Sequence, residues 1–351
     1  MTAAELAKLI DDGELVSRIS LAGENLSGGA FIAGTLEMVD LGGADLHGAT
    51  LRQSNFVHCK LAGADLSGAD LSAAAFIECD LSDATLGGAR LETTKFVKSN
   101  LAGIRLEQTP LARTIMVECD LTGAHFAGAR LERSSIVKSV TTAIDISHTD
   151  WHRAVLLDAD LRAANLAGAR FFRSTLIGAN FAGRKLPGFA CPACALSGAD
   201  FSDCDLTGAD FGQCLLIGSK FPNAMLTGAR LARAVLTRAV LIRTDLSGAD
   251  LSQAILIAAD ASEANLTQAK LFQCTATGLI ATGADFRGAD LSNADFSHAV
   301  LDRANLSDVV LNRTNFHAVS EQDARLPSRD GLLPPDKDRT ASETWLEQLP
   351  A

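Results

Sequence analysis

A large apolar residue, mostly Leu or Phe, occupies every fifth position from Leu21 to Phe316, and the register never slips. These positions define 60 consecutive pentapeptides. Another kind of residue stands at five of them: Thr141, Cys191, Ala261, Ala276 and Ala281. A five-residue unit cannot bury its apolar side chain alone, so it must stack on neighbouring units. The sequence therefore predicts one solenoid over residues 21–319.

The two positions before each large residue also follow a rule. The first is usually small, as at Ala64 and Ala69, and the second is often Asp or Asn, as at Asp65 and Asp70. Neither a helix, with its period of 3.6, nor a flat strand, with its period of 2, gives this pattern. We expect a chain that turns a corner every five residues, with Asp and Asn bonding the backbone at the corners.

Stretches such as AGADLSGADLSAAAF (62–76) and TGADFRGADLSNADF (282–296) resemble the A(D/N)LxX motif of the pentapeptide-repeat proteins. The resemblance covers residues 21–319. It implies an all-β fold, a right-handed quadrilateral β-helix of about 15 coils, with four pentapeptides in each coil. Similar pentapeptides recur at Phe56, Phe76 and Phe96, which also indicates a 20-residue coil.

Both ends of a solenoid expose unpaired strand edges and need caps. Residues 1–20 are predicted to form an N-terminal capping helix, with Thr2 and Glu5 as a capping box. Residues 320–339 contain three prolines and are predicted to be a linker. Residues 340–351 are predicted to form a C-terminal helix, whose Trp345 packs on the last coil or on another subunit.

Composition excludes some classes of protein. The net charge is −11, there is no Tyr, and there are two Trp, so direct nucleic-acid binding is not expected. No apolar run approaches the roughly 18 residues of a membrane span, so no membrane interaction is expected. The N-terminus does not resemble a signal peptide. We expect a cytoplasmic bacterial protein, with export by a non-classical route as the alternative.

The residues that often carry chemistry fall at structural positions. Seven of the eight cysteines occupy the small inward position, and Cys191 replaces a large residue, so we predict core thiols. The pair Cys191 and Cys194 lacks a second pair at matching spacing for zinc; a redox or metal role is the alternative. We find no nucleophile elbow and no phosphate loop. We therefore predict no enzyme activity, no catalytic residues, no cofactor and no metal.

The residue after the large one should face outward, and in seven successive coils it is apolar. We call this column the apolar stripe: Val57, Ile77, Val97, Val117, Val137, Leu157 and Ile177. β-branched residues suit an extended side of a coil, which is one explanation. The other is a docking surface for a partner or a second copy, because long exposed apolar stripes tend to be covered.

A second outward surface is rich in arginine. We call it the basic face: Arg113, Arg130, Arg133, Arg153, Arg170 and Arg173. Like charges stacked one strand apart repel unless something screens them. Either Glu92, Glu132 and Asp150 pair with these arginines locally, or the face binds an anionic partner.

The sequence predicts a non-catalytic rigid scaffold that binds another protein, of unknown identity, through these outward columns. A homodimer through the C-terminal helix or the apolar stripe is a further expectation. The family resemblance implies an alternative, a DNA-mimicking modulator of DNA gyrase of the quinolone-protection type. The chain departs from those proteins in its length, its lack of loop insertions and its arginine-rich middle. A second alternative is an accessory or effector protein of a bacterial secretion system.

Overall fold

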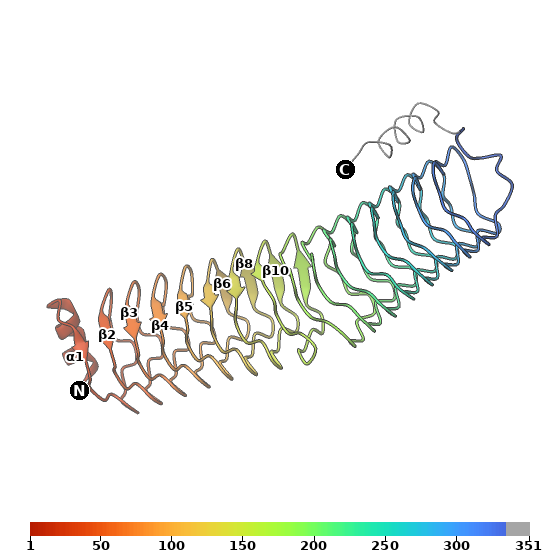
Figure 1. The fold of residues 1–351 in the computed structure, drawn as a ribbon. Helices are drawn as coiled ribbons and strands as arrows, with labels where there is room; N and C mark the ends of the chain where they lie inside the picture. Colours follow the sequence, from red (N-terminus) through yellow and green to blue (C-terminus); the bar gives the residue numbers. More distant parts are fainter. Residues whose placement is uncertain (335–351) are drawn as a thin grey trace, which may run out of the picture. The chain divides into compact units, whose positions relative to one another are not determined.

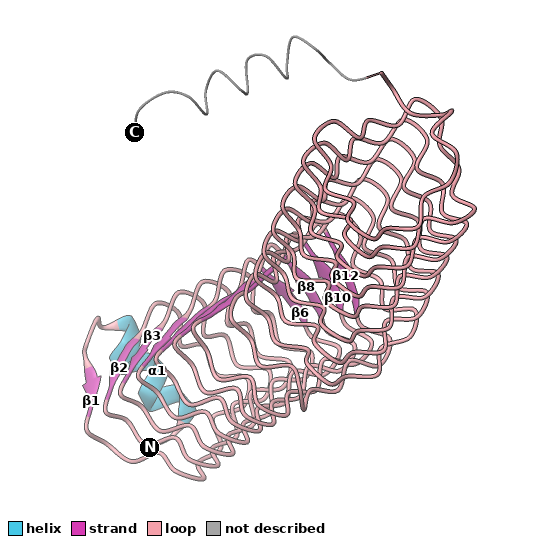
Figure 2. Ribbon diagram, turned by 45° about the vertical axis from the view of Figure 1, so that its right-hand side comes forward, coloured by secondary structure: helices cyan, strands magenta, loops and turns pink. Residues whose placement is uncertain are grey.

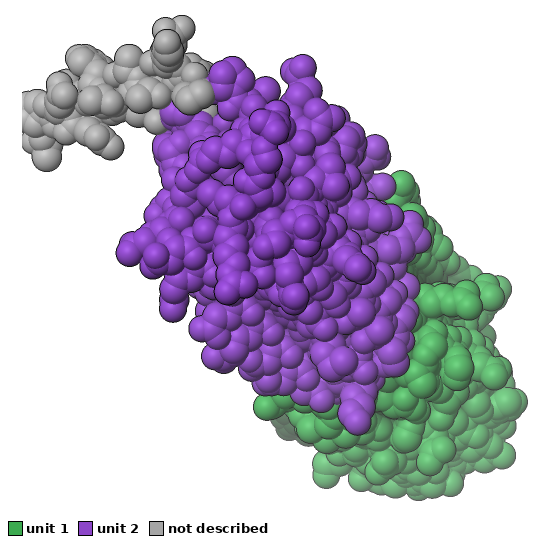
Figure 3. All heavy atoms as spheres, turned by 90° about the vertical axis from the view of Figure 1, so that its right-hand side faces the viewer, with its two compact units in different colours: residues 1–180 green, residues 181–351 purple. Residues whose placement is uncertain are grey.

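The computed structural model describes residues 1–334, in which the chain winds through successive parallel coils (Figure 1). It forms two compact units, which divide between Asn180 and Phe181 (Figure 3). The predicted helix at residues 340–351, with Trp345, and the end of the predicted linker lie outside the described residues.

The named elements all lie in the first unit. Helix α1 (Ala3–Asp11) comes first. Short strands follow in the order β1 (Val16–Ser17), β2 (Thr35–Glu37), β3 (Asn55–Val57), β4 (Ala75–Ile77), β5 (Lys95–Val97), β6 (Pro110–Ala112), β7 (Ile115–Val117), β8 (Arg130–Glu132), β9 (Ser135–Val137), β10 (Asp150–His152), β11 (Val155–Leu156) and β12 (Arg170–Phe172).

These strands form two parallel sheets, which Figure 2 shows in magenta. One has the order β1-β2-β3-β4-β5-β7-β9-β11, and the other has the order β6-β8-β10-β12. Every pairing joins residues 20 apart, as when Phe56 lies opposite Phe76 and Leu131 lies opposite Trp151. The structure therefore confirms the 20-residue coil.

The remaining sides of each coil pair through single residues. In the first coils, parallel bridges join Ser20 with Asp40, Asn25 with Asp45, and Ala30 with Thr50. Together with the β2–β3 pairing they give four sides, so the fold is a quadrilateral parallel β-helix. The eight-stranded sheet marks only those coils in which one side is long enough to form a strand. In the second unit such bridges run from Lys185–Asp205 to Asn305–Arg325, and a further bridge joins Thr314 with Leu332.

The large residue of each pentapeptide points into the core. Phe76 is fully buried between Phe56 and Phe96, with ring centroids 4.7 and 5.1 Å apart. At two irregular places the large and small positions are exchanged. The small Cys191 and Ala281 are buried at large positions, and the larger Phe189 and Leu279 are buried at small positions nearby. A core needs filled volume more than a fixed order of side chains.

Hydroxyl and thiol groups at the small inward position are also accommodated. The Thr94 hydroxyl donates to the Leu71 carbonyl at 2.8 Å, and the Thr244 hydroxyl donates to the Phe221 carbonyl at 2.7 Å. The Cys79 thiol makes the same contact with the Phe56 carbonyl at 3.3 Å. Each of these three groups thus has a partner in the preceding coil, which offsets the cost of burying it.

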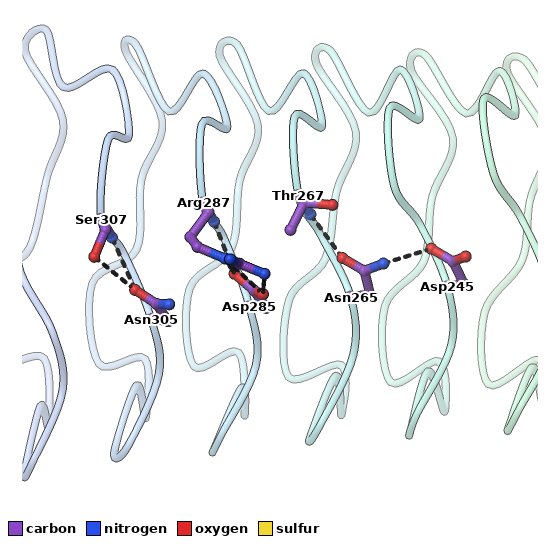
Figure 4. A network of polar contacts seen from close by, with 7 residues as sticks. All are labelled: Asp245, Asn265, Thr267, Asp285, Arg287, Asn305 and Ser307. Carbon is purple, nitrogen blue, oxygen red and sulfur yellow. Dashed lines mark hydrogen bonds and ion pairs between the residues drawn. The ribbon is translucent and has the colours of Figure 1, made fainter.

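The Asp and Asn residues fasten the corners, as predicted. Figure 4 shows one column, in which Asn265 accepts from the Thr267 amide at 3.1 Å and donates to Asp245 at 2.9 Å. In the next coil, Asp285 accepts from the Arg287 amide and pairs with its guanidinium at 2.6 Å. These side chains are occupied by local structure, so they are not free to bind a partner.

Helix α1 begins with the predicted capping box, since Thr2 and Glu5 each accept from the other's backbone amide. Leu6 and Ile10 are its buried residues, and Gly13 follows the helix with φ of +77°. The β-helix already begins at β1, because Val16 pairs with Leu36. The capping helix is therefore shorter than the predicted residues 1–20.

The predicted linker also begins too early. Ser320 bridges Val300, and Arg325 bridges Asn305, so residues 320–325 still belong to the β-helix. Backbone bridges need no particular side chain, which is why pairing continues after the Leu/Phe repeat ends. Leu311 and Phe316 are only half-buried, so the fully buried column of large residues ends before them.

The stacked phenylalanines allow a test of the core. Phe76→Ala should lower the free energy of unfolding by about 3–5 kcal/mol, because it opens a cavity between two rings. The control is Phe172→Ala, since Phe172 is 41% exposed and its loss should stay within about 0.5 kcal/mol. Urea unfolding followed by circular dichroism measures both, and equal losses would contradict this account of the core.

The corner aspartates predict a loss of stability in acid. Hydrogen bonds from the Ser67 side chain lower the pKa of Asp65, those from Thr207 lower the pKa of Asp205, and those from Arg287 lower the pKa of Asp285. A pKa that is lower in the folded state adds stability above the unfolded value of about 3.9 and loses it as the pH falls through the folded value.

The urea midpoint should therefore fall steeply below about pH 4. The triple variant Asp65→Asn, Asp205→Asn, Asp285→Asn keeps acceptors at the corners but removes three titrating groups. Its midpoint should change less between pH 7 and pH 3 than that of the natural chain. An unchanged slope would show that these aspartates do not contribute.

Candidate functional site

The apolar stripe lies on one side of the first unit. Val57, Ile77, Val97, Val117 and Val137 occupy the last positions of β3, β4, β5, β7 and β9, and each is paired in register with the next. Leu157 and Ile177 continue the column. All seven face outward: Ile77 and Ile177 are 37% and 41% exposed, and the other five are half-buried. The predicted surface therefore exists as a continuous column.

In two coils this surface is wider, because the residue directly before the large apolar residue of the pentapeptide is also apolar. Ile115 and Val155 face outward there and are half-buried, where Asn55, Lys95 and Ser135 stand in other coils. The signal was available in the sequence, because these residues replace the usual polar residue.

A charged column borders the stripe. His58 Nδ1 lies 3.3 Å from Glu78 Oε2, so these two side chains pair between successive coils. In the later coils of this column, within residues 1–334, no ion pair of 4.0 Å or less joins Lys98, Glu118 and Lys138.

The second unit carries a separate apolar patch that the expected site residues did not include. Leu215 bridges Val235, which bridges Ile255. Leu215, Ile217 and Ile257 are 45%, 43% and 39% exposed. This patch forms because apolar residues stand both before and after the large residue of the pentapeptide. Those before it replace the usual Asp or Asn.

All six arginines of the basic face are exposed. Four of them form a column at one corner, which we call the arginine ladder: Arg113, Arg133, Arg153 and Arg173. Each has a φ between +50° and +55°, so each sits in the left-handed turn that ends β6, β8, β10 or β12. The amides of Arg113 and Arg133 donate to the Glu132 and His152 carbonyls at 2.9 and 3.0 Å. The backbone therefore holds these arginine residues one coil apart.

Local carboxylates neutralise this ladder only in part. Arg113 pairs with Glu92 of the preceding coil at 3.4 Å. Within residues 1–334, no carboxylate lies within 4.0 Å of the guanidinium of Arg133, Arg153 or Arg173. The predicted local pairing is thus correct for Glu92, but Glu132 and Asp150 make no such contact.

The other two arginines lie at strand starts. Arg130 and Arg170 stand on either side of Asp150 in the register of β8, β10 and β12, so they are not direct neighbours. Over β6, β8, β10 and β12 and the turns that follow them, the basic face holds six arginines against Glu132 and Asp150. It is therefore a compact positive surface on a chain whose net charge is −11.

A surface hollow of about 380 Å³ lies on the same side in earlier coils. Arg52 and Arg90 line it together with Asp70 and Glu92, and Arg52 lies 3.9 Å from Asp70. Because its charges are balanced within the hollow, it lacks the positive excess of the basic face.

The cysteines are core thiols, as predicted. All eight are free and buried. Burial raises the pKa of Cys204 to about 11 and that of Cys274 to about 12, which keeps both thiols protonated at neutral pH.

Other kinds of site find little support in the described part of the chain. Among residues 1–334, no three His, Cys, Asp or Glu side chains come together as a metal site would require. In the same range, no helix has the length and apolar character needed to cross a bilayer. His152 stacks on Phe172, with ring centroids 5.5 Å apart, and so forms part of the basic face.

The family model of pentapeptide repeats matches the chain over residues 40–76, 74–111, 142–176, 154–189, 194–233, 234–275 and 282–317. Because these stretches cover more than half of the sequence, the chain belongs to the pentapeptide-repeat family. The β-solenoids of this family are generally non-catalytic. No curated protein matches the chain.

Several solved structures are similar to it. HetL, a pentapeptide repeat protein involved in heterocyst differentiation regulation from the cyanobacterium Nostoc, is 25% identical over 90% of this chain and 96% of its own, with a TM-score of 0.22. QnrB1, a plasmid-mediated fluoroquinolone resistance protein, is 20% identical over 56% of this chain and 98% of its own, with a TM-score of 0.31. A pentapeptide repeat protein from the Arabidopsis thaliana thylakoid lumen is 24% identical over 46% and 74%, with a TM-score of 0.12. These TM-scores are low, so the structures carry no argument about function.

The arginine ladder predicts a stability gain when one charge is removed. Arg133 lies between Arg113 and Arg153 and has no carboxylate within 4.0 Å, so Arg133→Gln should raise the free energy of unfolding by about 0.2–1 kcal/mol at low salt. The gain should fade as added salt screens the repulsion. The control, Arg113→Gln, loses the ion pair with Glu92 and should bring no gain. Thermal unfolding at two salt concentrations measures both, and a gain that ignores salt would contradict the repulsion.

Proposed function

We propose that this protein is a non-catalytic, rigid scaffold that binds another protein through the apolar stripe. The observation that carries the proposal is the column of seven outward apolar side chains on one side of the first unit. Pairing between successive coils holds this column straight, so a partner meets a preformed surface and little ordering entropy is lost on binding.

The second sheet argues against strand propensity as the whole explanation. If β-branched residues only suited extended sides, the equivalent outward positions of β6, β8, β10 and β12 should carry them too. Those positions hold Ala112, Glu132, His152 and Phe172 instead. The apolar column is therefore particular to one face, as expected for a surface that a partner covers.

The DNA-mimic alternative, suggested by the family resemblance, fits this surface poorly. A mimic of DNA should present acidic side chains along its sides, and the first unit presents an arginine ladder on one of them. An assay of gyrase supercoiling decides this alternative, since a mimic should inhibit the reaction in a salt-sensitive way.

The double variant Val97→Glu, Val117→Glu tests the proposal. It places two charges in the middle of the stripe, where burial against a partner would cost several kcal/mol per ion. Capture of the partner from a lysate of the source cells should be lost, while circular dichroism and the unfolding midpoint stay close to those of the natural chain.

The matched control is Thr237→Glu, Thr277→Glu, which changes the same outward position in the second unit, where the residue is already polar. It should leave capture unchanged. If the stripe variant captures the same partners as the natural chain, the stripe is not the binding surface. Loss of capture with the control variant would also count against the stripe.

A further inference from the structure

We propose that the arginine ladder and the adjoining His152 and Phe172 form a second binding surface, whose ligand is a short acidic peptide segment that also carries apolar side chains. This surface lies on β6, β8, β10 and β12 and the turns that follow them. It does not depend on the apolar stripe, because it uses different residues and a different kind of contact.

Among residues 1–334, most arginines of the ladder have no carboxylate partner of their own. The Arg113–Glu92 ion pair shows that a ladder guanidinium reaches the outward residue 21 positions earlier. The corresponding residues for Arg133 and Arg173 are Ala112 and His152, neither of which is a carboxylate. For Arg153 the corresponding residue is Glu132, which is more than 4.0 Å away. Three stacked arginines are thus left for carboxylates from outside.

The backbone holds the ladder arginines in place before any ligand binds. Each ladder residue follows a strand that pairs with its neighbours, and each is fixed in a left-handed turn. The next residues, Thr114, Ser134 and Ser174, are buried, and each donates a hydroxyl to a backbone carbonyl of the preceding coil. The backbone positions of the ladder arginines therefore repeat at about the strand spacing of 4.8 Å. Carboxylates at neighbouring or alternate residues of a peptide can reach such a row, since arginine side chains are long.

One end of the surface is apolar, because it exposes the ring of Phe172. Phe172 is 41% exposed, and the Arg173 guanidinium lies 5.1 Å from the centre of its ring. The His152 ring also stacks on Phe172, with the ring centroids 5.5 Å apart. An exposed aromatic ring among arginines offers apolar contact beside positive charge. A ligand that combines carboxylates with leucine-like side chains uses both.

The charge of the surroundings favours a peptide over a nucleic acid. Residues 1–180 contain 16 Lys and Arg against 22 Asp and Glu, so the positive surface is an island on a negative unit. A polynucleotide carries its charge along its whole length and would be repelled beyond the island. A short acidic segment can place its charges on the island alone.

The test is fluorescence anisotropy with the full chain and a labelled peptide of alternating Glu and Leu. We expect saturable binding that weakens as salt rises. The peptide in which Gln replaces every Glu should bind at least ten times more weakly. A single-stranded oligonucleotide of similar charge should also bind more weakly than the Glu peptide.

Two variants locate the site. Arg133→Gln, Arg153→Gln, Arg173→Gln should weaken peptide binding at least tenfold. The matched control, Arg233→Gln, Arg238→Gln, Arg243→Gln, removes three arginines of the second unit that are also in left-handed turns, and it should leave binding unchanged. A thermal unfolding curve of each variant checks that it is still folded at the assay temperature.

Three results would overturn the proposal. Equal binding of the Glu and Gln peptides would show that charge is not recognised. Equal losses in the two triple variants would show that the ladder is not the site. Tighter binding of the oligonucleotide would assign the surface to nucleic acid. None of these results bears on the apolar stripe, because the stripe residues are intact in every variant.

Discussion

The structure depends on backbone hydrogen bonds between residues in successive coils. Within each unit the strand pairings and nearly all the single-residue bridges join positions 20 apart, although the last bridge, between Thr314 and Leu332, joins positions 18 apart. Once this register holds, every side chain belongs to a column that repeats at the strand spacing. Inward columns make the core, and outward columns make the surfaces that a partner can meet. A single outward substitution is therefore read together with its neighbours one coil before and one coil after.

This arrangement separates packing from function. The inward columns tolerate Cys191 and Ala281 because Phe189 and Leu279 supply the missing volume nearby. The cysteines are buried in the same inward columns, and many of the acidic residues bond the backbone at the corners. Features that usually indicate chemistry thus have structural roles in this chain. The variation that packing does not explain lies on the outward columns, above all the apolar stripe and the arginine ladder.

The two surfaces lie on adjoining sides of the first unit. β6 (Pro110–Ala112) ends in the turn at Arg113 and Thr114, and β7 (Ile115–Val117) follows at once. The ladder thus occupies the corner between the sheet with the stripe and the sheet with the basic face. The two proposals differ in the source of affinity. A partner on the stripe would bury apolar area, whereas an acidic ligand on the ladder would relieve repulsion among its positive charges.

The sequence by itself determined the period, the coil of 20 residues, the buried columns, the corner fasteners and the N-terminal capping box, because each depends on local chemistry repeated in register. It also placed the stripe and the six arginines on outward positions. Only the tertiary structure decided that pairing between coils begins at Val16 in the first unit and still includes Arg325 in the second, since backbone bridges need no special side chain. It alone decided that Arg113 has a carboxylate partner and Arg133 does not, because ion pairing depends on the distance between side chains in different coils, which the period does not specify.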